Sequence, residues 1–157
     1  MIYTTTGNLL QSDADILCHQ VNFQGVMGAG IAKTIKDELL SPVQFDEYKQ
    51  LCKSQGSRLL GQVQYLEIDA SLRFVANLFC QNSFDRSAGI LTNYDAMRQC
   101  FSRVECMARE YRMTVAVPGM IGCGIAGGDW NAVKRILADV FGDSRVNLDI
   151  VYWDGSK

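Results

Sequence analysis

Residues 15–40 read DILCHQVNFQGVMGAGIAKTIKDELL and predict a strand, a glycine-bearing loop and a helix. Residues 15–21 form a short apolar run, typical of a buried strand. Three glycines follow within six residues, namely Gly25, Gly28 and Gly30. Apolar residues then recur every four positions, as on one face of a helix, at Ile31, Ile35 and Leu39. This order favours phosphate binding, because glycines admit a ligand close to the backbone and the helix start offers free N–H groups.

The same stretch is also compatible with a tight turn that binds nothing, because glycines after strands are common. It contains neither the dinucleotide fingerprint GxGxxG nor the phosphate loop GxxxxGK[ST]. Residues 119–128, however, form a second glycine-rich segment, between a predicted strand ended by Pro118 and a predicted helix capped by Asp129. In a mostly parallel sheet, two such loops lie at the carboxyl edge, where together they can hold a diphosphate.

The remaining sequence predicts an α/β fold, with helices on both faces of a six-stranded mixed sheet and one domain spanning residues 1–157. The other predicted strands cover residues 2–6, 63–68, 72–80, 114–117 and 146–153, and those at 63–68 and 72–80 form a hairpin. The other predicted helices cover residues 43–54 and 92–111 and follow Asp129. We expect Pro42 to close the first helix, and Thr92 with Asp95 to form a capping box. Residues 81–90 are expected to form a surface loop.

Composition excludes several functional classes. The net charge is −2 with both signs scattered, which argues against general nucleic-acid binding. No window is apolar enough to span a membrane, and no signal peptide is apparent, so we expect a cytoplasmic monomer. Six cysteines form no CxxC pair and there is one histidine, which argues against a metal site and predicts reduced, mostly buried thiols. No cofactor is expected.

Taken together, three segments resemble the macro domains, a family that binds ADP-ribose. GNLLQSDADILCHQVN (residues 7–22) resembles the family's opening. MGAGIA (27–32) and VPGMIGCGIAGGDW (117–130) are similar to its two phosphate loops. The resemblance covers nearly the whole chain and implies the three-layer α/β/α macro domain fold. ADP-ribose or a derivative is the implied ligand, and an ADP-ribosylated protein a further partner.

The resemblance also implies roles for individual residues. Asn8 and Leu9 would lie at the adenine, and Asn22 at the distal ribose. The diphosphate would lie on two loops, made of Met27, Gly28, Ala29, Gly30 and Ile31, and of Ile121, Gly122, Cys123, Gly124, Ile125 and Ala126. Trp153 would stack on adenine; the alternative is an aromatic that fills the rim of the core. Asn8 and Asn22 are equally consistent with turn residues that bond their own backbone.

Two branches of the family are similar, and they bear on catalysis in opposite ways. Gln81 and Ala126 stand where the ADP-ribosyl-glutamate hydrolases carry a lysine and an aspartate, and the absence of these two groups argues against that branch and favours a reader. The other branch, the yeast-type phosphatase of ADP-ribose 1″-phosphate, resembles this chain in the H-x-x-N of His19 and Asn22. We therefore predict hydrolysis of such a derivative, with His19 as acid or base and Asp129 next in line. The alternatives are a structural histidine and N-cap, and a reader of free or protein-linked ADP-ribose.

Overall fold

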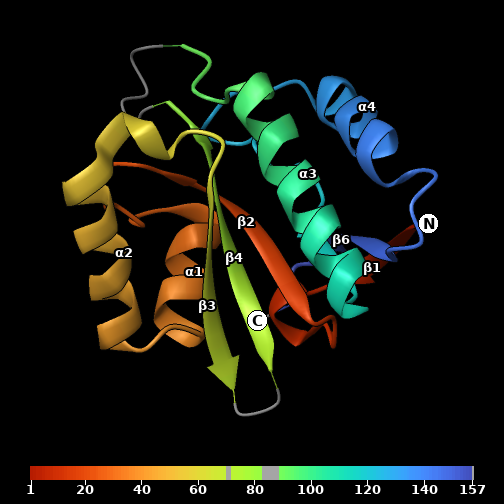
Figure 1. The fold of residues 1–157 in the computed structure, drawn as a ribbon, viewed down its shortest axis with the longest axis horizontal. Helices are drawn as coiled ribbons and strands as arrows, with labels where there is room; N and C mark the ends of the chain where they lie inside the picture. The colour runs from red at the N-terminus through yellow and green to blue at the C-terminus, as the bar shows by residue number, and fades with distance from the viewer. Residues whose placement is uncertain (70–71, 83–88, 157) are drawn as a thin grey trace.

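The computed structural model describes residues 1–69, 72–82 and 89–156 (Figure 1). Its strands, in chain order, are β1 (Ile2–Gly7), β2 (Ile16–Asn22), β3 (Val63–Asp69), β4 (Arg73–Gln81), β5 (Val115–Pro118) and β6 (Leu148–Trp153). Its helices are α1 (Gly30–Glu38), α2 (Pro42–Gln55), α3 (Tyr94–Tyr111) and α4 (Trp130–Phe141), with 3-10 turns at Leu9–Gln11 and Gly56–Leu59. The predicted order of elements is therefore confirmed.

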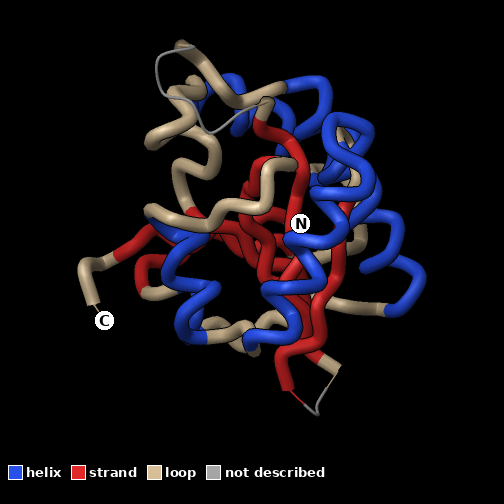
Figure 2. The backbone as a smooth tube through the Cα atoms, turned by 90° about the vertical axis from the view of Figure 1, so that its left-hand side faces the viewer, coloured by secondary structure: helices blue, strands red, loops and turns tan. Residues whose placement is uncertain are grey.

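All six strands belong to one sheet, in the order β1-β6-β5-β2-β4-β3. Every neighbouring pair is parallel except β3 and β4, which form the predicted antiparallel hairpin. Its turn at residues 70–71 lies outside the described residues. Figure 2 shows the strands in the middle of the molecule, with helices to either side. The carboxyl ends of β1, β6, β5, β2 and β4 consequently meet at one edge.

The helices cover the two faces of the sheet in pairs. Ile35 of α1 and Tyr48 of α2 pack with Leu17 and Val21 of β2 on one face. On the other face, the apolar sides of α3 and α4 pack against the alternate residues of β2, such as Cys18. Side chains alternate along a strand, so one strand supplies both cores. The three-layer α/β/α prediction is confirmed, and the methionine and aromatic stripe of α3 is core, with Met97 and Phe101 fully buried.

Two predicted helix boundaries are wrong. Pro42 does not close α1, which ends at Glu38; it occupies the first turn of α2, behind a capping box of Ser41 and Gln44. Proline suits that position because the first N–H groups of a helix have no intrahelical acceptor. Asn93, not Thr92, caps α3, accepting from the backbone N–H of Ala96. Thr92 is instead buried and bonded to the second glycine loop, a contact that sequence spacing does not reveal.

Some predictions about exposure also need correction. An apolar residue at the start of a helix predicts burial, but Val43 of α2 is 68% exposed, and Ile31 of α1 is exposed too. Only part of the loop predicted for residues 81–90 can be assessed, because residues 83–88 lie outside the described residues; Gln81 belongs to β4. All six cysteines are free thiols, four of them buried as predicted. No helix in the described ranges is long and apolar enough to cross a membrane.

Candidate functional site

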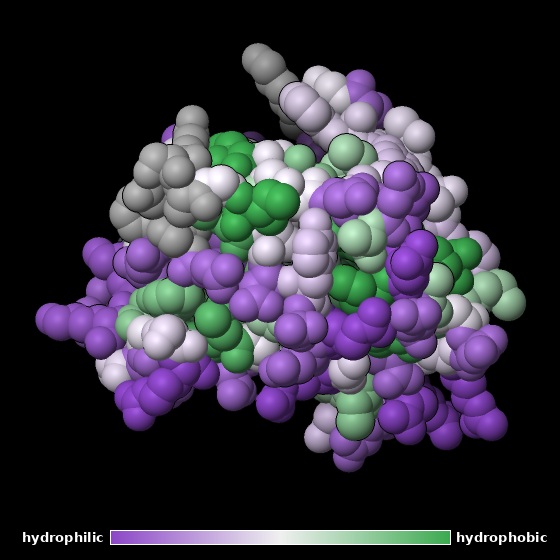
Figure 3. Space-filling view, turned by 90° about the horizontal axis from the view of Figure 1, so that it is seen from above, coloured by the Kyte–Doolittle hydropathy of each residue, from purple (hydrophilic) through white to green (hydrophobic). Residues whose placement is uncertain are grey.

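Two loops lie at the adjoining carboxyl ends of neighbouring strands. The segment after β2 leads to α1 on one face of the sheet, and the segment after β5 leads to α4 on the opposite face. Where neighbouring parallel strands send their chains to opposite faces, the loops diverge, and ligands of α/β proteins bind at that point. We call the segment 23–29 with the start of α1 the first loop, and residues 119–129 the second loop. Figure 3 looks onto the side where β4 ends.

The first loop presents backbone N–H groups without acceptors. The N–H groups of residues 28–32 donate to nothing among the described residues; the next donor, Lys33, bonds to the carbonyl of Ala29 at 3.3 Å. The cap residue Ala29 has no side chain that could accept a bond. Gly28, Ala29 and Gly30 are exposed, while Met27 beneath them is buried. These N–H groups, at the positive end of the helix dipole, form a ready anion site.

The second loop presents another such run. The N–H groups of residues 124–126 have no acceptor within the described chain. The loop is held from behind, because the N–H of Gly128 bonds the carbonyl of Gly122 at 2.8 Å, and that of Leu91 bonds Ala126 at 2.8 Å. Gly122 has a φ of +74°, and a Cβ on it would lie 2.9 Å from both Gln20 and Met97. Consecutive N–H groups on a turned backbone make a concavity for anions.

Several predicted ligand residues have buried side chains. Leu9, Met27, Ile121 and Ala126 are each less than a tenth exposed. Their side chains anchor the loops from below, so these residues can reach a ligand through their backbone alone. Ile31 and Ile125 are exposed, and Cys123 is half-buried. Burial, followed by the nearby Asp129 carboxylate, raises the pKa of the Cys123 thiol, which keeps it protonated.

Both polar atoms of the Asn22 side chain form hydrogen bonds with its own loop. Its Oδ1 accepts from the N–H of Gln24 at 3.0 Å and more weakly from Val26, and its Nδ2 donates to the Val26 carbonyl at 2.8 Å. The hydroxyl of Tyr48, fully buried on α2, donates to the Asn22 carbonyl at 2.7 Å. The turn-residue alternative therefore holds, and Asn22 shapes the first loop. Sequence reasoning identified Tyr48 only as an inward residue, because nothing local links it to Asn22.

Asn8 and Trp153 lie together at the far end of the same edge. Gly7 pairs with Trp153 where β1 and β6 end. Asn8 caps the following turn, and its Oδ1 accepts from the N–H of Leu10 at 3.0 Å. The indole of Trp153 is 73% exposed and bonds only through Nε1, to the Ser156 carbonyl at 2.9 Å. This exposure excludes the core-rim alternative and leaves an open aromatic face at the edge of the sheet.

His19 lies in the core on β2, three residues before Asn22, where the first loop starts. β2 is regular up to Val21 and shifts register only between Val21 and Asn22, so His19 shares the buried face of Leu17 and Val21. Its Nε2 lies 2.5 Å from the Asn77 Oδ1, and Asn77 in turn donates to Gln64. The side chain is 0% exposed, and burial lowers its pKa from 6.5 to about 4, against a smaller opposing effect of the Asn77 bond. This position does not support the predicted catalytic role.

Asp129 and Gln81 are the other polar groups that the sequence singled out. Asp129 is exposed at the end of the second loop and caps α4, accepting from the N–H of Asn131 at 2.9 Å. Gln81 receives a long bond of 3.4 Å from Gln20, which also donates to Thr92 at 3.1 Å. Thr92 donates to the Gly122 carbonyl, so this cluster supports the second loop. The sequence signal for it, a glutamine within an apolar strand, was missed.

Metal-ligating side chains do not gather anywhere in the described ranges in groups of three or more. The chemistry available at this edge is therefore that of backbone N–H groups, one open indole, amide side chains and an exposed carboxylate. Backbone N–H groups suit an anion, and an open indole suits an aromatic base next to it. Neither interaction makes or breaks a covalent bond.

The comparisons agree with this arrangement. No family model matches the chain. Curated relatives from Mycobacterium tuberculosis (strain ATCC 25618 / H37Rv) and Mycobacterium bovis, both named DNA ADP-ribosyl glycohydrolase, are 32% identical over 145 residues. The match covers 90% of this chain and 39% of each relative, so the chain spans about two fifths of their length.

Solved structures match over nearly the full chain. A Bacteroides thetaiotaomicron protein of unknown function has a TM-score of 0.84 at 27% identity, with 98% of both chains covered. The macrodomain of Mycobacterium tuberculosis DarG has a TM-score of 0.80 at 27% identity, with 97% of both covered. Thermosipho africanus DarTG, solved in complex with ADP-ribose, shares the fold at 17% identity, with a TM-score of 0.76 over 99% of this chain and 42% of that one. The chain belongs to the macro domain family.

Proposed function

We propose that this chain binds ADP-ribose, with the diphosphate on the unpartnered N–H groups of residues 28–32 and 124–126. The observation that carries this proposal is the pair of N–H runs on adjoining loops, each with no acceptor among the described residues. A diphosphate supplies the oxygen acceptors that such groups need, and the dipole of α1 favours its negative charge. The fold is shared with Thermosipho africanus DarTG, which was solved in complex with ADP-ribose.

The order of the strands gives the ligand a direction. Trp153 and Asn8 lie at the ends of β6 and β1, the second loop follows β5, and the first loop follows β2. We place adenine on the open indole face, the diphosphate between the loops and the distal ribose near the Asn22 turn. Asn22 serves this pocket by holding the first loop in shape, since its side-chain atoms are already bonded to that loop.

A second candidate function is hydrolysis of the bond at the 1″ position of the distal ribose. The curated relatives support it by their name, DNA ADP-ribosyl glycohydrolase, although this chain spans only part of their length. Asp129 is the candidate acid or base, because its carboxylate is exposed where the second loop ends, whereas His19 is buried elsewhere. Binding without turnover, as a reader, requires none of these groups. ADP-ribosylated protein and DNA are the partners that these two functions would serve; cytoplasmic location and the monomeric state stay predictions.

Calorimetry with ADP-ribose, ADP and NAD tests the binding proposal. Gly28→Val and Gly124→Val are the informative variants, because neither glycine has a positive φ and an added Cβ would meet no clash. Both should fold with unchanged melting temperature and lose at least about tenfold in affinity for ADP-ribose, since the side chain fills the space beside the N–H groups. Affinity equal to wild type in both would place the diphosphate elsewhere.

Turnover is tested by following release of ADP-ribose or phosphate from 1″-linked substrates. Asp129→Asn keeps the helix cap, because asparagine also caps, and removes the proton-transfer group. Loss of turnover with ADP-ribose binding kept supports the hydrolase. His19→Gln serves as the matched control and should leave turnover intact. No turnover by the wild type, with tight binding of ADP-ribose, leaves the reader function.

A further inference from the structure

A separate cavity of about 430 Å³ lies beside the Asn22 turn. One wall is residues 23–25 of the first loop, and the other is formed by α2, with the exposed Lys49, Gln50 and Lys53 and the buried Cys52. Its volume falls within the range of small-molecule sites, roughly 300–1,000 Å³. The residues proposed for the diphosphate and adenine do not line it.

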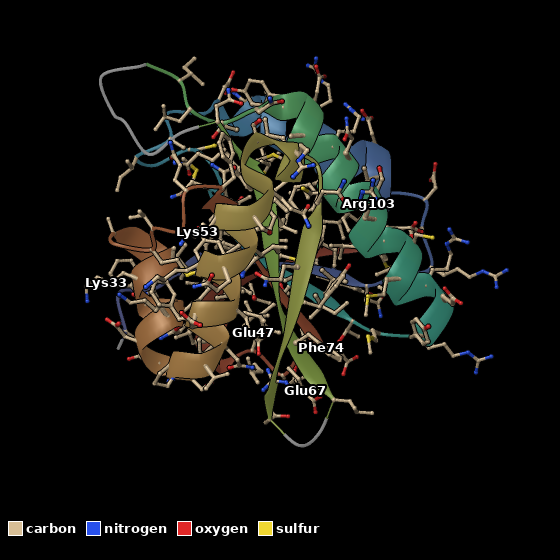
Figure 4. All side chains as sticks on the ribbon, turned by 60° about the vertical axis from the view of Figure 1, so that its left-hand side comes forward. Lys33, Glu47, Lys53, Glu67, Phe74 and Arg103 are labelled. Atoms are coloured by element: carbon tan, nitrogen blue, oxygen red, sulfur yellow. The ribbon has the colours of Figure 1, made fainter. Side chains whose placement is uncertain are left out.

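The charge of this cavity is entirely positive. Among the described residues, Lys49 and Lys53 form no ion pair, and no carboxylate lines the cavity. Lys33 and Lys36 on the neighbouring helix α1, in contrast, share Asp37, at 2.6 and 3.8 Å. Figure 4 shows Lys53 on α2 and Lys33 on α1 toward the same side of the molecule. The amide of Gln50, which also lines the cavity, can add a neutral N–H donor.

Each lysine has a local structural role that does not account for the cavity as a whole. Lys53 lies in the last turn of α2, where a cation complements the helix dipole. The ammonium of Lys49 lies 5.6 Å from the Phe45 ring, and its stem packs against Gly25, where a Cβ would be 3.5 Å from Cγ. Neither contact supplies a negative charge. Two lysines that line one cavity, with no carboxylate among its lining residues, suit an anion.

The position of the cavity identifies which part of a ligand would reach it. Phe23, Gln24 and Gly25 follow Asn22 directly, and Tyr48 and Cys52 of α2 face the Asn22 carbonyl, with Sγ at 3.9 Å. α2 packs on the face of the sheet that α1 also covers, and β5 lies between β6, which ends at Trp153, and β2, which ends at Asn22. A ligand that runs from Trp153 to the Asn22 turn therefore points its far end at this cavity.

We propose that the cavity lined by Lys49 and Lys53 is an anion subsite that takes a phosphate group attached to the distal ribose of the ligand. The proposal rests on the proposed function, since it assumes that ADP-ribose ends at the Asn22 turn. The phosphate is either a 1″-phosphate or the backbone of a nucleic acid that carries ADP-ribose, because both present the same anionic oxygens. Two lysines make a local contact, which differs from the broad basic face of a general nucleic-acid binder.

The experiment measures the affinity of the wild type and of two double variants for three probes. The probes are ADP-ribose, ADP-ribose 1″-phosphate and a single-stranded oligonucleotide that carries ADP-ribose. The test variant is Lys49→Gln with Lys53→Gln. The control is Lys33→Gln with Lys36→Gln, which removes the same charge from α1 outside the cavity. Lys33, Lys49 and Lys53 are exposed, and Lys36 is half-buried with its ammonium 5.2 Å from the Phe45 ring, so the melting temperature of each variant is measured beside its affinity. Where a probe is turned over, kcat/KM replaces affinity.

The test variant should bind ADP-ribose within about twofold of wild type and lose about tenfold or more for a phosphate-bearing probe. The control variant should lose much less. The probe affected identifies the source of the phosphate. The affinity of wild type for that probe should also fall more steeply with salt than that of the test variant, because ion contacts are screened.

Unchanged affinity of the test variant for both phosphate-bearing probes would overturn the subsite. An equal loss for all three probes would also overturn it, since the lysines would then serve ADP-ribose itself. If wild-type protein binds no ADP-ribose, the proposed function fails, and inorganic phosphate becomes the probe of the cavity. Phosphate-induced shifts in the NMR signals of residues 23–25 that vanish in the test variant would support the anion site, and their absence in wild type would overturn it.

Discussion

The two glycine loops present similar N–H groups but are built by different means. The first loop is held by side-chain hydrogen bonds, through Asn22 and the Tyr48 hydroxyl. The second is held by close packing of backbone on backbone, where a Cβ on Gly128 would lie 2.5 Å from the Gly122 carbonyl oxygen. The strands that precede them differ as well, because β2 contains the buried His19 and β5 contains only apolar residues. Loops that present similar N–H groups can therefore be held either by side-chain hydrogen bonds or by close packing of the backbone.

The largest difference should appear when a side chain is added to the second loop. Gly128→Val places atoms against a backbone carbonyl that cannot move away, so we expect a loss of about 3–4 kcal/mol in the free energy of unfolding. Gly28→Val in the first loop meets only ordinary van der Waals contact, 3.6 Å from Val26, and should cost less than about 1 kcal/mol. Urea unfolding of both variants makes the comparison. Equal losses would show that the loops are not built differently.

Acid should weaken the first loop selectively. The pKa of His19 is about 4 in the folded state and 6.5 when the chain is unfolded, so the unfolded state binds the extra proton between these values. Stability is therefore unaffected above about pH 7 and falls as the pH drops from 6.5 to 4, by about 3 kcal/mol in total. Denaturant unfolding across this range measures it.

The matched variant is His19→Gln, which can still donate to Asn77 but does not titrate. The free energy of unfolding of this variant should lack the decrease that His19 protonation causes between pH 6.5 and 4. Amide exchange at pH 5 should accelerate first in residues 22–29, which follow β2, and later in residues 119–128. A wild-type profile that stays flat between pH 7 and 4.5 would contradict the assignment of a neutral, buried imidazole.

Thr92 anchors the second loop through its side chain, and its removal should have a moderate effect. Thr92→Val keeps the shape but leaves the buried Gly122 carbonyl with the Gly128 N–H as its remaining donor, and Gln20 without an acceptor at that position. We expect a loss of about 1–2 kcal/mol. Affinity for ADP-ribose should fall less than in Gly124→Val, because close packing still holds the loop. Calorimetry and urea unfolding of the same samples separate the two effects.

The smallest effect is expected for Tyr48→Phe, the corresponding change at the first loop. The ring still stacks on Phe79, with centroids 6.0 Å apart, so what is lost is the contact of the hydroxyl with the Asn22 carbonyl and, at 3.1 Å, with its Oδ1. We expect about 1 kcal/mol in stability and a few-fold loss in ADP-ribose affinity. If Tyr48→Phe loses more ADP-ribose affinity than Thr92→Val, the first loop depends more on its side-chain hydrogen bonds than the second loop does. No change in affinity would argue that Asn22 holds the loop unaided.

The sequence by itself determined the features that depend on neighbouring residues. Period-two and period-3.6 patterns located the strands and helices, and the chain order of strands and helices gave the three-layer α/β fold. The glycine clusters located both loops, and the Asp129 cap is a local hydrogen bond that the order of residues already implies. The likeness to the macro domains came from the same local segments.

Only the tertiary structure decided what depends on contacts between distant residues. Whether His19 faces a loop or the core follows from where β2 loses its regular register, which is set by pairing with β4. The Tyr48 bond to Asn22 and the Thr92 bond to Gly122 span 26 and 30 residues. The cavity of Lys49 and Lys53 exists because α2 packs beside the first loop. Such contacts arise from the packing of helices and strands, whose geometry no local pattern of residues encodes.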